Sequence, residues 1–232
     1  MNAKSRRKLE MGTRVLDFSR SHPDASPGYT AALTRLEALL GRADELASRQ
    51  RDGLLEVRGA TARKRELRRA MRQAHLTHLA RVAKVAARED PDLAQKFVLK
   101  PGTTTYLAFR TAARGMAAEA QNHRELLVKH GLVDTVLDDL GHALDQFDAA
   151  VEHGTRGRQA HVGASAELRA VADEVVQIVY VMDGLNRYRF MKDAELLAAW
   201  ESASNVLAAP RPAAKPAPEE PPPSGGEVRP AA

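Results

Sequence analysis

The sequence predicts an all-α protein, an elongated antiparallel bundle of five to six main helices with a short terminal helix and a disordered C-terminal tail. Two stretches without proline, 28–90 and 102–209, cover most of the 232 residues. Proline inside a helix removes a hydrogen bond and clashes with the preceding turn, so its absence favours helix. Apolar residues recur at helical spacing through both stretches. The aromatic fraction is only 4%, so the core is expected to consist of leucine, valine and alanine, which suit packing between helices.

Composition divides the chain into three segments. Residues 1–24 form a basic helix and turn, residues 25–208 the helical bundle, and residues 209–232 a tail rich in proline and alanine. Eight of the twelve prolines lie in the tail, and no apolar periodicity runs through it. Such a segment cannot bury enough surface to offset the entropy of ordering it, so we expect it to be disordered.

The N-terminal half is expected to contain a first helix over about 4–20 and a long helical region from Tyr29. Apolar residues in this region recur at steps of four and three, which is the spacing of one helix face. The first row is Tyr29, Leu33, Leu36, Leu40, Ala43 and Ala47, continued by Leu54 and Val57, and the second is Leu67, Met71, Ala74, His78, Val82 and Val85.

The two rows do not join at regular spacing. A continuous helix needs an irregular step near Ala60, and Gly59 lies at this fault. Because glycine is common just past the end of a helix, the sequence favours a break between Gly53 and Thr61. The alternative is a single kinked helix of about 62 residues, which would be about 93 Å long.

Four further helices are expected in the C-terminal half. The first follows a loop over 89–102, is capped by Thr103, Thr104 or Thr105, and ends at Gly131. The second covers about 132–153, and the third covers about 165–185 with Ser165 as its N-cap. The last runs from Asp193 to about Leu207. A loop over 154–163 is expected from Gly154, Gly157 and Gly163, and a turn over 183–192. Together these helices predict a coiled-coil-like up-and-down bundle.

A basic block lies between Arg58 and Arg72. On a helical wheel, five arginines share one face: Arg58, Arg65, Arg68, Arg69 and Arg72. Since the guanidinium group matches phosphate geometry, one hypothesis is a face that binds nucleic acid or anionic lipid. The sequence favours the other hypothesis, a solvated face that answers acidic residues elsewhere, because no aromatic residue is interleaved for base stacking.

An acidic stripe runs along the helix expected at 132–153. Its members fall within about a quarter of the wheel and are Asp134, Asp138, Asp145, Asp148 and Glu152. Carboxylates that bind a divalent cation converge on one point, whereas a stripe along a straight helix spreads its charges. We interpret this stripe as solvated or as facing a protein partner.

Candidate ligands for a metal are few. His75 and His78 are three residues apart, and Glu119 and His123 four apart, but neither pair forms part of a known metal motif. His78 lies in the apolar row and is expected to be a hydrogen-bonded core residue. No metal or other cofactor is predicted. An enzyme would need a convergent set, for which His78 with His123 or Glu119 is the one candidate.

The segment Asn186-Arg187-Tyr188-Arg189-Phe190 is the densest mixture of aromatic and basic residues. One hypothesis is a contact point for a partner or a nucleic acid. The other, which is favoured, is that Tyr188 and Phe190 dock the last helix.

Composition also bears on location. The chain has no cysteine, which excludes disulfides and thiolate metal sites. The basic N-terminus is followed by no apolar run, so no signal peptide is expected, and no stretch approaches the roughly 18 apolar residues of a membrane span. We therefore expect a cytoplasmic protein.

The charge is unevenly distributed. Residues 1–90 carry a net charge of +9, residues 91–209 a net charge of −4, and the tail none. Complementary charge predicts a non-enzymatic interaction or assembly protein that binds a protein partner or itself through helix faces. Nucleic-acid binding through 58–72 is the alternative, and no small-molecule substrate is indicated.

Overall fold

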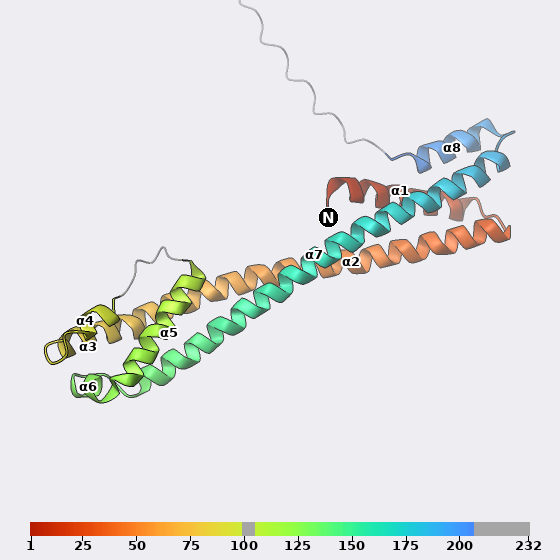
Figure 1. Cartoon of the computed structure of the whole chain (residues 1–232). Helices are drawn as coiled ribbons and strands as arrows, with labels where there is room; N and C mark the ends of the chain where they lie inside the picture. Colours follow the sequence, from red (N-terminus) through yellow and green to blue (C-terminus); the bar gives the residue numbers. More distant parts are fainter. Residues whose placement is uncertain (99–104, 207–232) are drawn as a thin grey trace, which may run out of the picture.

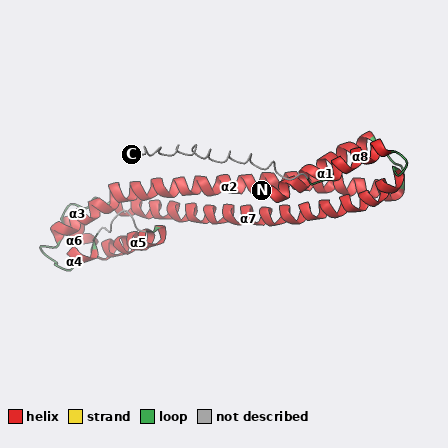
Figure 2. Ribbon diagram, turned by 90° about the horizontal axis from the view of Figure 1, so that it is seen from above, coloured by secondary structure: helices red, strands yellow, loops and turns green. Residues whose placement is uncertain are grey.

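The computed structural model describes residues 1–98 and 105–206 and confirms an elongated, antiparallel, all-α fold. Two long helices, α2 (Pro27–Ala70) and α7 (Thr135–Arg189), run side by side along the molecule (Figures 1 and 2). With 55 residues, α7 is about 80 Å long. The smaller helices pack at the two ends of this pair (Figure 1). The expected disordered tail, Thr103, Thr104 and the expected helix end at Leu207 lie outside the described residues.

The predicted break between Gly53 and Thr61 is wrong. The helix passes through both residues, and α2 continues directly into η1 (Met71–Leu76) and α3 (Thr77–Ala86). The buried row of α2 keeps a seven-residue repeat across the apparent fault, with Leu46, Gly53, Ala60 and Leu67 all buried. Small residues therefore occupy helix-contact positions that look empty when only large apolar side chains are counted.

The second predicted row is displaced by the π-helical segment η1. In a π-helix the hydrogen bonds connect residues five apart, so the apolar face shifts by one position. Met71 is buried and the next buried residue is Leu76, five positions later, whereas Ala74 is exposed and Val85 is 45% exposed. The buried row then continues through Leu79, Val82, Ala83 and Ala86.

The glycine-rich loop predicted over 154–163 is also wrong, because α7 is helical through all of it. Ser165 is not an N-cap, since its hydroxyl donates a hydrogen bond of 2.7 Å to the carbonyl of His161 within the helix. The turn expected from residue 183 begins only at Phe190. The two helices expected over 28–90 therefore form one continuous helical stretch, and the two expected over 132–153 and 165–185 form the single helix α7.

One end of the pair is covered by α1 (Ala3–Ser21) and α8 (Ala194–Ser204). These match the predicted first and last helices, and Asp193 caps α8 by accepting a hydrogen bond from the Leu196 amide. Trp200 is fully buried and packs edge-on against Phe18 at 5.4 Å between ring centroids. This aromatic contact joins α8 to α1, so the end is closed by residues from both termini of the described bundle.

The other end consists of α3, α4 (Leu93–Lys96), α5 (Tyr106–Asn122) and α6 (Arg124–Lys129). Thr105 caps α5 as predicted. The helix expected to run on to His130 is interrupted at His123, and Gly131 takes a φ of +101° that favours glycine. Phe109 and Phe147 lie side by side in the core of this end.

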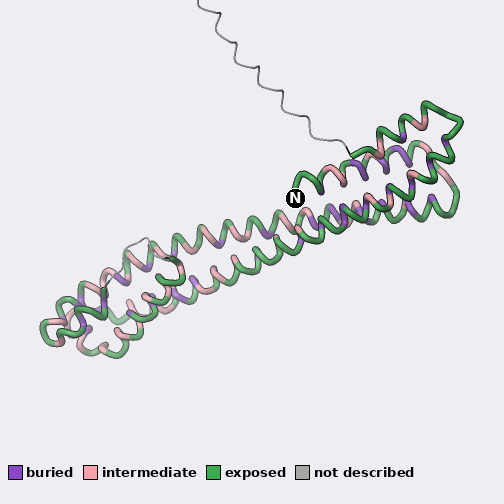
Figure 3. Tube along the Cα trace, turned by 45° about the horizontal axis from the view of Figure 1, so that its top comes forward, coloured by how far each residue is buried: buried purple, intermediate pink, exposed green. Residues whose placement is uncertain are grey.

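These two cores are separate. One joins α1, α2, α7 and α8, and the other joins α2 through α7 at the opposite end. Buried residues accordingly gather toward the two ends of the molecule (Figure 3). Between them lies a waist, which we define as Gln50, Gly53 and Ala60 of α2 with Gly157 and His161 of α7.

At the waist the two long helices approach very closely. A Cβ atom on Gly53 would lie 2.7 Å from the carbonyl oxygen of Gly157, and a Cβ on Gly157 would lie 2.7 Å from the Cβ of Glu56. Only glycine fits both positions without movement of the backbone. The crossing therefore depends on the absence of two side chains.

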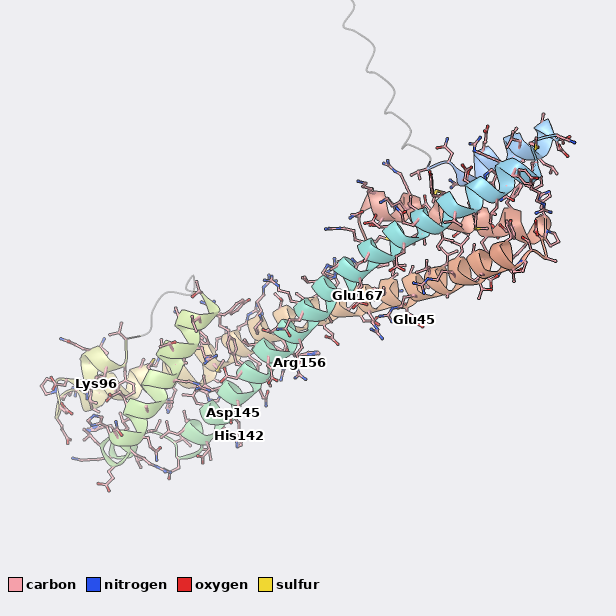
Figure 4. All side chains as sticks on the ribbon, turned by 45° about the vertical axis from the view of Figure 1, so that its right-hand side comes forward. Glu45, Lys96, His142, Asp145, Arg156 and Glu167 are labelled. Carbon is pink, nitrogen blue, oxygen red and sulfur yellow. The ribbon has the colours of Figure 1, made fainter. Side chains whose placement is uncertain are left out.

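Polar pairs on one flank define the register of α2 against α7. Arg35 bonds Glu174 at 2.7 Å, Arg42 bonds Glu167 at 2.7 Å, and Arg63 bonds Gln146 at 2.8 Å. The positions advance by multiples of seven along α2 and retreat by the same multiples along α7. An antiparallel heptad register produces this pattern. Figure 4 labels Glu45 on α2 and Glu167 on α7, which both pair with Arg42.

We expect Gly53→Ala to lower the free energy of unfolding by about 1–3 kcal/mol, because the new methyl group meets backbone atoms. The matched control is Gly59→Ala on the same helix, where a Cβ meets nothing within 4 Å. That variant should stabilise by roughly 0.5–1 kcal/mol, since alanine favours helix. Urea unfolding followed by circular dichroism measures both. Equal stabilisation by the two variants would contradict the close crossing.

Candidate interaction surfaces

The basic face lies on the outer side of α2. Arg58, Arg65 and Arg72 are seven residues apart, so they form a row with a step of about 10.5 Å. Arg58, Arg65 and Arg69 are exposed. Among residues 1–98 and 105–206, these three make no ion pair. Arg51 extends the row by one more heptad. The sequence pattern did not include Arg51 because it lies outside the contiguous basic block.

Arg68 has a different role from the rest of the predicted basic face. Its guanidinium lies over the ring of Phe109 at 5.0 Å and of Tyr106 at 5.8 Å, and Lys64 lies over Tyr106 at 5.1 Å. Cations over aromatic faces attract the ring quadrupole. Arg68 therefore helps to hold α5 against α2. The sequence pattern missed this because the aromatic partners are about 40 residues away.

Some carboxylates of the acidic stripe form ion pairs with arginines, and others are exposed without a pair in the described residues. Asp148 forms ion pairs with Arg110, at 3.3 Å, and with Arg114 of α5. Asp134 pairs with Arg124 of α6 at 3.2 Å, and Glu152 with Arg156 on its own helix at 3.6 Å. Asp138 and Asp145 are exposed, and Figure 4 labels Asp145 on α7.

Within the described residues, Arg58, Arg65 and Arg69 of the basic face make no ion pair with the acidic stripe. Asp148 and Asp134 face α5 and α6, whose arginines answer them. The intramolecular pairing expected for the basic face is therefore not made by Arg58, Arg65 or Arg69 within the described chain. Their charge remains available to an anionic partner.

The outer side of α7 near its C-terminal end carries exposed apolar side chains, which we call the outer apolar face. Its large members are Tyr180 at 77% exposure, Val181 at 53%, Leu185 at 39% and Tyr188 at 80%. The buried residues Val175, Val179, Met182 and Asn186 lie on the opposite side of the helix. Of the two residues predicted to dock the last helix, Phe190 is buried and packs against Phe18 of α1 at 5.9 Å, whereas Tyr188 is exposed.

A groove of about 430 Å³ borders this face between α7, α1 and α8. Met11, Val176 and Val179 contribute apolar surface, and Tyr180 also lines it. Asp183 accepts hydrogen bonds of 2.8 Å from the Trp200 indole and from Arg187. The groove has an apolar lining with a charged pair at its rim.

A polar network occupies the waist. The Gln50 amide donates to the Ser165 hydroxyl at 2.6 Å, and the His161 Nδ1 donates to the Gln50 carbonyl at 2.9 Å. The N-terminal amine of Met1 also bonds the Gln50 side chain. These groups come from α2, from α7 and from the residue Met1 that precedes α1, and they satisfy one another. Their role is to hold the crossing together where apolar side chains are missing.

The predicted metal candidates do not converge. His123 and Glu119 lie 3.6 Å apart, but Lys96 is 3.1 Å from Glu119 and 3.2 Å from His123, so an ammonium group already occupies their shared position. His78 Nε2 is buried without a hydrogen-bond partner, contrary to the expected hydrogen-bonded core residue. No group of three metal-binding side chains occurs among the described residues.

Surface pairs perturb several ionisable groups. Hydrogen bonds from Lys129 hold the pKa of Glu89 below its ordinary value, and a bond from Lys8 does the same for the pKa of Asp173. The Ser26 amide and hydroxyl lower the pKa of Asp24. Two arginine pKa values are raised: that of Arg42 by Glu167 and Glu45, and that of Arg187 by Asp183 and Glu201. Each of these groups joins separate elements or neighbouring turns.

Comparisons with protein-family models, curated proteins and solved structures found no match to this chain. Within the described ranges, no helix combines the length and the hydropathy needed to cross a bilayer.

Glu89→Gln should make stability less sensitive to acid. The folded-state pKa of Glu89 is depressed, so its contribution is present above the unfolded pKa and is lost as the pH falls through the folded value. The variant should melt slightly lower at neutral pH and converge with the parent in acid. Thermal melts from pH 7 to pH 3 check this. Glu10→Gln, exposed and without an ion pair in the described chain, is the control; an identical curve for both variants would contradict the expectation.

Proposed function

We propose that this chain is a non-enzymatic interaction or assembly protein that associates with other proteins through exposed helix faces. The observation that supports the proposal is the outer apolar face of α7. Two tyrosines there are 77% and 80% exposed. Contiguous exposed apolar side chains on a water-soluble surface commonly mark a protein contact.

The spacing of these side chains supports helix packing as the mode of contact. Gln177, Val181, Gly184 and Tyr188 follow steps of four and three along α7, which is the spacing of a helix seam. The inner seam of the same helix is already filled by α2. The outer row therefore provides a second packing face on the opposite side.

Charged surfaces would set the orientation of a partner. The basic row on α2 and the exposed carboxylates Asp138 and Asp145 lie on different helices. Complementary charge contributes more to specificity and to the rate of association than to affinity. A partner that contacts both the apolar face and one charged row would thus bind in one orientation. A cytoplasmic location is part of this proposal and agrees with a chain that has no cysteine.

A photoreactive phenylalanine in place of Val181 should form protein adducts in the native host, because this position lies within the outer apolar face. The same replacement of Gln159, which is exposed elsewhere on α7, is the matched control and should give none. Adducts are measured by gel shift and mass spectrometry. Absence of protein adducts at both positions would refute association through this face.

Nucleic-acid binding is the second candidate, and the unpaired arginines of the basic face favour it. Arg58, Arg65 and Arg69 lie within about 17 Å along one helix. Phosphate binding by such a row is independent of sequence and falls steeply with salt.

Charge reversal tests this second candidate. If the row binds phosphates, Arg58→Glu with Arg65→Glu and Arg69→Glu should lower the slope of log affinity against log salt by about 3. The control reverses Arg81, Lys84 and Arg88, which are exposed at the far end and change the net charge equally. Fluorescence anisotropy with random-sequence duplex at about 50 and 200 mM salt measures both. No binding by the parent protein at the lower salt would exclude this function.

A further inference from the structure

The outer apolar face of α7 is symmetrical about Gly184. Tyr180 and Tyr188 lie four residues before and after it, and each is more than three-quarters exposed. Successive steps of four residues rotate by about 40° on a helix, so all three positions share one side. A Cβ on Gly184 would meet nothing within 4 Å. The face thus presents an aromatic side chain, a gap and a second aromatic side chain.

We propose that this face binds a second copy of the chain, with the two α7 helices antiparallel and a two-fold axis passing through Gly184. The inference rests on the proposed function and names its partner. In a two-fold interface each residue that contacts another is contacted by it in return. Around Gly184, Tyr180 of one copy faces Tyr188 of the other, and the pair occurs twice.

Gly184 permits the close approach that this arrangement needs. It lies inside α7, five residues before the last helical residue, and glycine within a helix is unfavourable by roughly 0.5–1 kcal/mol relative to alanine. At the waist of this same molecule, Gly53 and Gly157 show what a glycine at a helix contact can do: each allows the opposite helix to approach closely. Gly184 would do so between copies.

The bordering groove provides room for the aromatic side chains. Tyr180 lines it together with Val176, one turn earlier in α7, and with Val179, the residue just before it. In the antiparallel pairing Tyr188 of the second copy lies over this region. Tyrosine is well suited to such a contact, because its ring is apolar and its hydroxyl can remain hydrogen-bonded at the rim.

Charge does not oppose this pairing. The outward positions Gln177, Tyr180, Val181, Gly184, Leu185 and Tyr188 carry no charged side chain. At the edge, Arg187 pairs at 2.8 Å with both Asp183 and Glu201, so this cluster carries one net negative charge. The outward positions themselves can therefore meet without bringing like charges together, and few side chains need to be immobilised because both tyrosines have only two rotatable torsions.

Disulfide trapping tests the axis directly, because the native chain has no cysteine. Gly184→Cys should form a covalent dimer under mild oxidation, since a disulfide requires Cα atoms within about 7 Å. The matched control is Gly163→Cys, also exposed on α7 and with open space around its Cβ. Non-reducing gels of the purified full chain measure both. Absence of a dimer for Gly184→Cys, or equal dimer for both variants, would overturn the proposed axis.

Sedimentation velocity of the cysteine-free protein supplies the second measurement. The parent chain should show a concentration-dependent dimer, and Tyr188→Ser should raise its dissociation constant by roughly tenfold or more, because the change removes two aromatic contacts per dimer. Circular dichroism confirms that the variant folds. An unchanged dissociation constant would overturn the role of Tyr188.

These outcomes separate the inference from the proposed function. A parent chain that is monomeric up to high micromolar concentration, with adducts of a different protein at position 181, would overturn self-association and leave the interaction role in place. A Gly184→Cys dimer together with adducts of the chain itself supports both.

Discussion

The fold depends on one close contact, the crossing of α2 and α7 at Gly53 and Gly157. With a Cβ on either glycine, backbone or side-chain atoms would lie at 2.7 Å, so the helices would separate along the waist. The heptad register on each side would then lose its alignment. The pairs Arg42–Glu167 and Arg63–Gln146 lie on opposite sides of the crossing and keep the same register. The crossing therefore keeps α2 and α7 in one heptad register through both cores.

Helix type could be predicted from the sequence, but helix continuity could not. Proline placement and apolar spacing identified the all-α fold, the first and last helices and the Thr105 cap. Gly53, Gly59, Gly154 and Gly157 look alike in a sequence, since each is a residue without a side chain in a helical pattern. Their meaning depends on the opposite helix about 100 residues away: three of them are contact positions, whereas Gly59 has open space.

The role of a charged surface residue likewise depends on residues that are distant in the sequence. A helical wheel placed five arginines on one face, but only the position of α5 separates Arg68, which lies over Phe109, from Arg65, which is exposed. In the same way, Arg110 and Arg114 of α5 decide that Asp148 is a structural residue. Periodicity identifies the side of a helix. It does not identify which element covers that side, so a candidate surface can be divided between packing and exposure.

The arrangement of the ends explains why the exposed apolar residues lie where they do. The buried row of α7 is satisfied by α2 along its length, and α1 and α8 complete the core at the end that contains Trp200. Added helices on one side leave the outer side of α7 uncovered, and there the sequence has tyrosine and valine rather than the charged residues found on the outer sides of α2. Polar residues would cost nothing at these solvent-facing positions. The apolar residues there, symmetrical about a glycine, are the side chains that the proposed pairing of two copies would remove from water.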